Sequence, residues 1–64
     1  MKRNKLLTYL KEQGCEFYKE GANHTVYINK ATHHLSTIPR HNDIDDNLAG
    51  KICKDLNVPK FLSH

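Results

Sequence analysis

Apolar residues near the start of the chain recur at the spacing of an amphipathic helix. Leu6, Leu7 and Leu10 form one apolar stripe among lysines and other polar residues. Asn4 is a favourable N-cap residue, and Gly14 can adopt the left-handed conformation that ends a helix. The pattern therefore predicts a first helix over residues 5–13, with the leucines facing the core.

A second helix is predicted near the other end, beginning at Asp43 or Asp45 and running to about Leu56. Its apolar positions recur every fourth residue and predict a broad buried face. Gly50 interrupts this pattern, and we expect it to allow close packing on the sheet or on the first helix. The residues expected on the buried face are Ile44, Leu48, Ala49, Ile52, Cys53 and Leu56.

Between the helices, three short runs predict strands over residues 15–19, 24–28 and 34–38. Residues 20–23 form the first turn, residues 29–32 the second, and Pro39 ends the third strand. In the middle strand, alternation places Val26 and Ile28 on the core side and Thr25 and Tyr27 on the opposite side. The same alternation places His24 on the core side, at the mouth of the strand.

This order predicts an α+β fold, α-β-β-β-α, with a three-stranded antiparallel sheet and both helices on one face. At 64 residues the chain forms one domain, 1–64, with a tail from about residue 60. The other face of the sheet is expected to stay open to solvent or to a partner. Cys15 and Cys53 lack zinc-ligand spacing and are too few for a disulfide framework, so we expect both to be buried apolar residues.

The net charge of +3 is unevenly distributed. Residues 1–41 carry seven Lys or Arg and three Glu, which gives +4, and residues 42–64 carry three Lys and four Asp, which gives −1. The basic portion suits phosphate contacts and the acidic one a basic partner, although ordinary solvated charge explains both equally well. No segment resembles a signal peptide or a membrane span, so we expect a cytoplasmic protein with no membrane partner.

His24 is the strongest candidate for chemistry, because a glycine turn, residues 21–23, presents it at the edge of a strand. An imidazole with an unperturbed pKa of about 6.5 can accept or donate a proton near neutral pH. A second cluster, Ile38-Pro39-Arg40-His41, follows the third strand. On these residues alone, a structural histidine bonded to the backbone is the more probable interpretation.

The chain also resembles the HicA family of toxins from bacterial toxin–antitoxin pairs. The resemblance runs from Leu6 to Val58 and involves Gly14, residues 21–27, residues 38–41, and the closing pattern Leu48-Ala49…Ile52…Asp55-Leu56. It implies a fold like the double-stranded RNA-binding domain, cleavage of single-stranded messenger RNA, and neutralisation by an acidic HicB-type antitoxin. It also maps the family's catalytic histidine onto His24. Many members carry Ser and His where this chain has Ala22 and Asn23.

The implied reaction needs only proton transfer and charge stabilisation, because RNA supplies its own nucleophile, the 2′-hydroxyl. We expect His24 to act as general base or acid, and a 2′,3′-cyclic phosphate as the product. No metal or other cofactor is expected, because the four aspartates lie at or within the second helix. The residues expected to bind substrate are Lys19, Gly21, Asn23, Arg40 and His41.

Two other classes of function remain open. One is a non-catalytic RNA-binding module, in which Tyr18 and Tyr27 on an exposed face could stack on bases. A module that binds RNA phosphates at the start of its second helix would need lysines there, whereas this helix begins with aspartates. The other is a metal site, but its candidate ligands lack helical i, i+4 spacing. Those candidates are His24, His33, His34 and His41.

Overall fold

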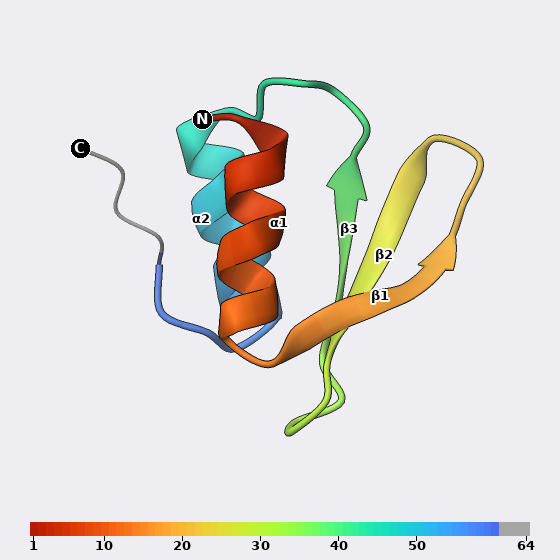
Figure 1. Ribbon diagram of the computed structural model, residues 1–64, viewed down its shortest axis with the longest axis vertical. Helices are drawn as coiled ribbons and strands as arrows, with labels where there is room; N and C mark the ends of the chain where they lie inside the picture. Colours follow the sequence, from red (N-terminus) through yellow and green to blue (C-terminus); the bar gives the residue numbers. More distant parts are fainter. Residues whose placement is uncertain (61–64) are drawn as a thin grey trace.

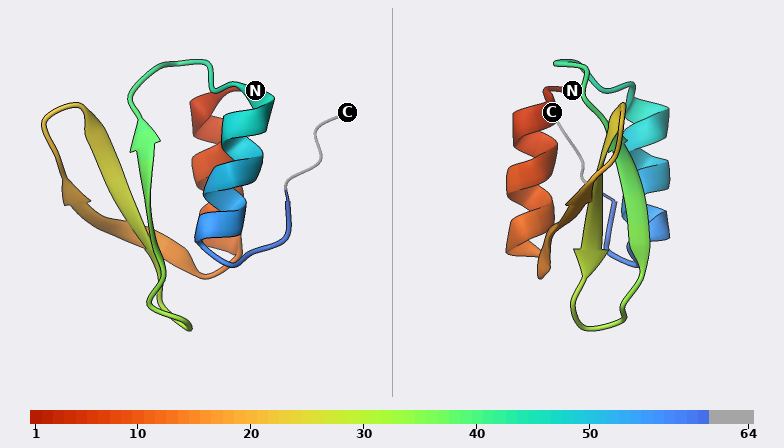
Figure 2. Two further views of the ribbon diagram at one scale, coloured as in Figure 1. Left: turned by 180° about the vertical axis from the view of Figure 1, so that it is seen from behind. Right: turned by 90° about the vertical axis from the view of Figure 1, so that its right-hand side faces the viewer.

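The computed structural model describes residues 1–60 and has the five predicted elements in the predicted order. They are α1 (Arg3–Glu12), β1 (Cys15–Glu20), β2 (His24–Asn29), β3 (Leu35–Pro39) and α2 (Asp46–Asp55). The strands form one antiparallel sheet in the order β1-β2-β3, and both helices lie on the same face of it (Figures 1 and 2). The α+β fold is confirmed. Most of the predicted tail, including His64, lies outside the described residues.

The helix α1 begins earlier than predicted, and Asn4 is not its cap. Lys2 occupies the N-cap position without a side-chain cap bond, and it forms a β-bridge with Asp43. The amide of Arg3 donates to the carbonyl of Asn42 at 2.8 Å. The bridge to the β3–α2 loop thus provides a partner for the first helical amide, which sequence spacing alone cannot indicate. At the other end, Gly14 has φ +90°, as predicted for the residue that stops the helix.

The helix α2 matches its prediction at both ends. Asp45 caps it by accepting from the amides of Asn47 and Leu48 at 3.0 and 3.4 Å. Gly50, however, faces neither the sheet nor α1. A Cβ at this position would lie 3.2 Å from Cε of Lys60, so Gly50 leaves room for the side chain of the C-terminal segment.

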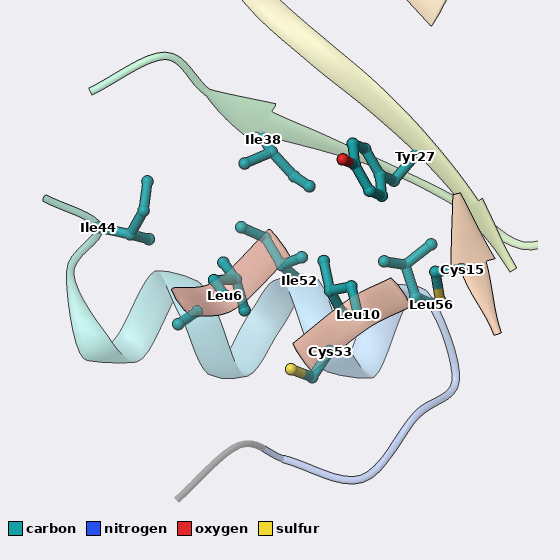
Figure 3. Packing of buried hydrophobic residues seen from close by; sticks show 10 residues of the cluster. Leu6, Leu10, Cys15, Tyr27, Ile38, Ile44, Ile52, Cys53 and Leu56 are labelled. Atoms are coloured by element: carbon teal, nitrogen blue, oxygen red, sulfur yellow. The ribbon is translucent and has the colours of Figure 1, made fainter. Parts of the chain in front are cut away.

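The face of β2 that packs on the helices is the reverse of the predicted one. Thr25, Tyr27 and Asn29 are buried, whereas Val26 and Ile28 are half-buried on the outer face. Hydropathy favours valine and isoleucine for the core, but each buried polar side chain of β2 has a hydrogen-bond partner that offsets its desolvation. Figure 3 shows the ring of Tyr27 among the core side chains.

A β-bulge interrupts the alternation of β1. Phe17 pairs with Tyr27 and Lys19 pairs with Val26, so Tyr18 is the extra residue between them. Beyond the bulge, Lys19 shares the outer face with Val26. Glu20, which pairs with Thr25, shares the helix side with it.

The core lies between the two helices and the sheet (Figure 3). Both cysteines are buried and free, as predicted, and burial raises the pKa of the Cys15 thiol. Asn29 joins the sheet to the end of α2, because its side-chain nitrogen donates to the carbonyl of Leu56 at 2.7 Å. The buried apolar residues are Leu6, Leu10, Cys15, Tyr27, Ile38, Ile44, Ala49, Ile52, Cys53 and Leu56.

Candidate nucleic-acid interface

A tight turn places His24 at the beginning of β2. The amide of Gly21 donates to the carbonyl of His24 at 2.8 Å, which closes the turn between β1 and β2. On its other side, His24 pairs with Pro39 of β3. The side chain is exposed and lies on the outer face, because its neighbour Thr25 is buried on the helix side. The predicted core-side position of His24 is therefore wrong, although its position at the strand mouth is right.

The outer face also carries Lys19. Since Lys19 pairs with Val26, it lies diagonally across the ladder from His24. Diagonal neighbours in antiparallel sheets have Cα atoms about 7–8 Å apart, which long side chains can span. The bulge at Tyr18 is the reason for this placement, because strict alternation from Cys15 would put Lys19 on the helix side.

Arg40 lies on the helix side of the same turn. Its guanidinium donates to the carboxylate of Glu20 and, at 2.8 Å, to the carbonyl of Gly21. Arg40 and His24 thus approach the turn from opposite faces of the sheet. The structure brings Lys19 and His24 to one face, but it does not bring Arg40 to them.

Sequence reasoning missed the network that continues from Glu20. The hydroxyl of Thr25 donates to Glu20 at 2.7 Å and accepts from Nη2 of Arg3 at 2.9 Å. Nε of Arg3 donates to the carbonyl of Pro39 at 2.9 Å. The pairing of Glu20 with Thr25 could have been found only by anticipating the bulge, and Arg3 was expected to precede the helix.

Two cavities border the first helix. A cavity of about 440 Å³ lies between the start of α1 and the β3–α2 loop, and Arg40 is the only predicted site residue that lines it. A second, of about 330 Å³, runs along α1 and is lined by none of the predicted site residues. The larger cavity is lined by Lys2, Arg3, Asn4, Lys5, Arg40 and Asn42.

The remaining candidates are dispersed. Asn23 is exposed in the β1–β2 turn, and His41 is exposed in the β3–α2 loop. His33 and His34 are exposed in the turn between β2 and β3, which lies at the opposite end of these strands (Figure 1). The histidines therefore do not gather, and residues 1–60 contain no group of three potential metal ligands among His, Cys, Asp and Glu.

The aromatic candidates separate as well. Tyr18 is 51% exposed and its neighbour Phe17 is 52% exposed. Tyr27 is buried, so the prediction that it lies on an exposed face and could stack on a base is wrong.

Within the described part of the chain, neither helix is long and apolar enough to cross a membrane. Comparisons with family models, with curated proteins and with solved structures find no match to this chain.

Proposed function

We propose that this protein is a metal-independent endoribonuclease of the HicA type, the toxin of a toxin–antitoxin pair, acting on messenger RNA in the cytoplasm. The observation that carries the proposal is the position of His24. Its imidazole is exposed at the start of β2, and it makes no hydrogen bond to another side chain within residues 1–60. The ring is therefore accessible to an extended RNA strand on the open face of the sheet.

In the proposed reaction, the 2′-oxygen attacks the adjacent phosphorus while the bond from phosphorus to the 5′-oxygen breaks. His24 accepts the proton of the 2′-hydroxyl, and the leaving 5′-oxygen takes a proton from solvent or from an imidazolium. The products are a 2′,3′-cyclic phosphate and a 5′-hydroxyl. Lys19, on the same face, is positioned to offset charge on the phosphate.

Arg40 has a different role in this proposal from the one the sequence suggested. Its bonds to Glu20 and to the carbonyl of Gly21 hold the turn that presents His24. Arg40 is accordingly a positioning residue for His24. Gly21 contributes its backbone to the turn, and the exposed Asn23 remains a candidate substrate contact.

The proposed antitoxin contact is the outer face rather than the start of α2. Asp43 and Asp46 lie in ion pairs with Lys2 and the terminal ammonium, and Asp45 caps the helix, so these carboxylates already have partners within the chain. The outer face instead offers half-buried aliphatic side chains and Leu35, which is 47% exposed. A HicB-type protein covering this face would also block His24.

The test is cleavage of a fluorescently labelled single-stranded RNA by the purified protein, with and without EDTA. We expect cleavage in EDTA, and a loss of about 100-fold or more in His24→Ala, since one general acid or base contributes roughly 10²–10⁴-fold. His34→Ala is the matched control, because His34 is exposed at the other end of the hairpin. Full activity in His24→Ala, or its loss in EDTA, would refute the proposal.

A non-catalytic RNA-binding module is the second candidate, and the exposed pair Phe17 and Tyr18 favours it. Stacking of a base on an aromatic side chain contributes about 1–3 kcal/mol. Saturable binding of intact RNA that weakens in Tyr18→Ala, with no cleavage at any concentration, would support the module over the nuclease.

A further inference from the structure

The cavity beside the start of α1 has an unusual concentration of positive charge. Its volume of about 440 Å³ is within the range typical of small-ligand sites, about 300–1,000 Å³. Four of its six lining residues are cations, and the other two are asparagines whose amides can donate hydrogen bonds. This lining suits an anion.

Arg3 is a cation of this lining that has no carboxylate partner among residues 1–60. It is half-buried, and its side chain donates hydrogen bonds to two neutral oxygens, the carbonyl of Pro39 and the hydroxyl of Thr25. No carboxylate lies within ion-pair distance of its guanidinium in the described part of the chain. Those two bonds fix the plane of the guanidinium and leave other N–H groups of its five free to donate.

The other three cations are only partly neutralised. Lys2 pairs with Asp43 at 3.2 Å and Arg40 pairs with Glu20, whereas Lys5 is exposed and has no carboxylate partner within residues 1–60. The four positive charges are therefore opposed by two carboxylates, which leaves an excess of two positive charges around the cavity. Planar guanidinium groups and amide donors match the oxygens of a phosphate group.

We propose that this cavity binds a phosphate group through Arg3, Lys5, Arg40 and Asn42. The site lies on the helix side of the sheet, whereas His24 lies on the outer face, so it is separate from the proposed cleavage site. Binding here does not depend on whether His24 cleaves RNA. If both sites hold one nucleic-acid strand, that strand passes around the end of the sheet formed by the β1–β2 turn.

The experiment is a titration of the ¹⁵N-labelled protein with inorganic phosphate and, separately, with dimethyl phosphate, followed by NMR. We expect saturable shifts of the Arg3 Nε–H and of the Asn42 side-chain amide. Lys5→Gln should weaken the affinity for the bound probe about tenfold, the effect of losing one hydrogen bond to a charged group. Lys11→Gln, an exposed position near the other end of α1, should change it less than about twofold.

Lys5 makes no ion pair or side-chain hydrogen bond within residues 1–60, so Lys5→Gln should fold normally, and unchanged far-UV circular dichroism will check this. Binding of dimethyl phosphate in the cavity indicates the diester of a nucleic-acid backbone, and binding of inorganic phosphate alone indicates a free or terminal phosphate. Shifts from neither probe overturn the proposal. Equal weakening in Lys5→Gln and Lys11→Gln also overturns it, because it shows diffuse attraction without a site.

Discussion

Asn29 connects three parts of the fold through one buried side chain. Its nitrogen donates to the carbonyl of Leu56 at 2.7 Å, and its oxygen accepts from the amide of Ala31 at 3.0 Å. The residue is only 4% exposed. Leu56 is the C-cap residue of α2, and carbonyls at this end of a helix have no donor within the helix. Replacing Asn29 therefore perturbs β2, the following turn and the end of α2 together.

Asn29→Ala should lower the free energy of unfolding by about 2–3 kcal/mol. Each neutral hydrogen bond contributes about 1 kcal/mol net, and a buried carbonyl left without a donor adds part of its desolvation cost of about 1–3 kcal/mol. A single core in a domain this small rarely supplies more than about 3–5 kcal/mol in total. The remaining stability of about 0–3 kcal/mol makes Asn29→Ala marginally folded at 25 °C, and a stabilising osmolyte should increase its folded fraction.

Urea denaturation followed by circular dichroism measures the effect. With a slope of about 1 kcal/mol/M, the midpoint should fall by about 2 M or more at an unchanged slope. Asn47→Ala is the control, because the Asn47 side chain is exposed and only its backbone amide takes part in the cap. A loss below about 0.5 kcal/mol in Asn29→Ala, the range of ordinary surface substitutions, would refute this account of Asn29.

Asn29→Asp separates the two bonds. The aspartate keeps the acceptor for Ala31 but directs a second oxygen at the carbonyl of Leu56. Ionisation of this buried carboxyl is unfavourable, so protonation, which restores a donor, should partly recover stability at acidic pH. A variant equally unstable at pH 4 and pH 7 would contradict the assigned donor direction.

Further predictions concern other parts of the chain. Asp45→Ala should lower the free energy of unfolding by about 1 kcal/mol through loss of the α2 cap, measured by urea denaturation. Gly50→Ala should raise the free energy of unfolding by up to about 1 kcal/mol, because only the flexible end of the Lys60 side chain must move. Gly14→Ala should lower the free energy of unfolding by about 1 kcal/mol, because φ is +90° at this position. The same urea denaturation measures both. The raised pKa of Cys15 predicts stability that falls as pH rises above the ordinary thiol pKa of about 8.5, since the unfolded thiol ionises first. A denaturation series from pH 7 to 10 checks this. The fall should become smaller in Cys15→Ala, and the part that remains near pH 10 comes from Tyr9 and Tyr27, whose pKa values burial also raises.

The order of elements was predictable from the sequence because each one has strong local signals. The stop at Gly14 and the cap at Asp45 depend on backbone conformation and bonds within a few residues. The start of α1 was not predictable in this way. It depends on the bridge from Lys2 to Asp43, which joins residues far apart in the sequence.

Hydropathy alone predicts the wrong buried face for β2. A strand with valine and isoleucine on one side and threonine, tyrosine and asparagine on the other favours the aliphatic side for the core. The polar side is buried instead because Arg3, Glu20 and the Leu56 carbonyl provide bonds for Thr25 and Asn29. Those partners come from β1 and both ends of the chain, so they are known only once the fold is known. The same limit explains why the cation-lined cavity was missed.

The bulge at Tyr18 decides which sign of charge lies beside the two arginines. If the present residues continued from Phe17 without a bulge, Tyr18 would pair with Val26 and Lys19 with Thr25, so a lysine would replace Glu20 beside Thr25 and Arg40. Deletion of the bulged residue would instead restore regular alternation and keep Lys19 and Glu20 on the faces they now occupy. Proteins that share this architecture can therefore lose the bulge together with its extra residue, but they cannot lose the bulge alone.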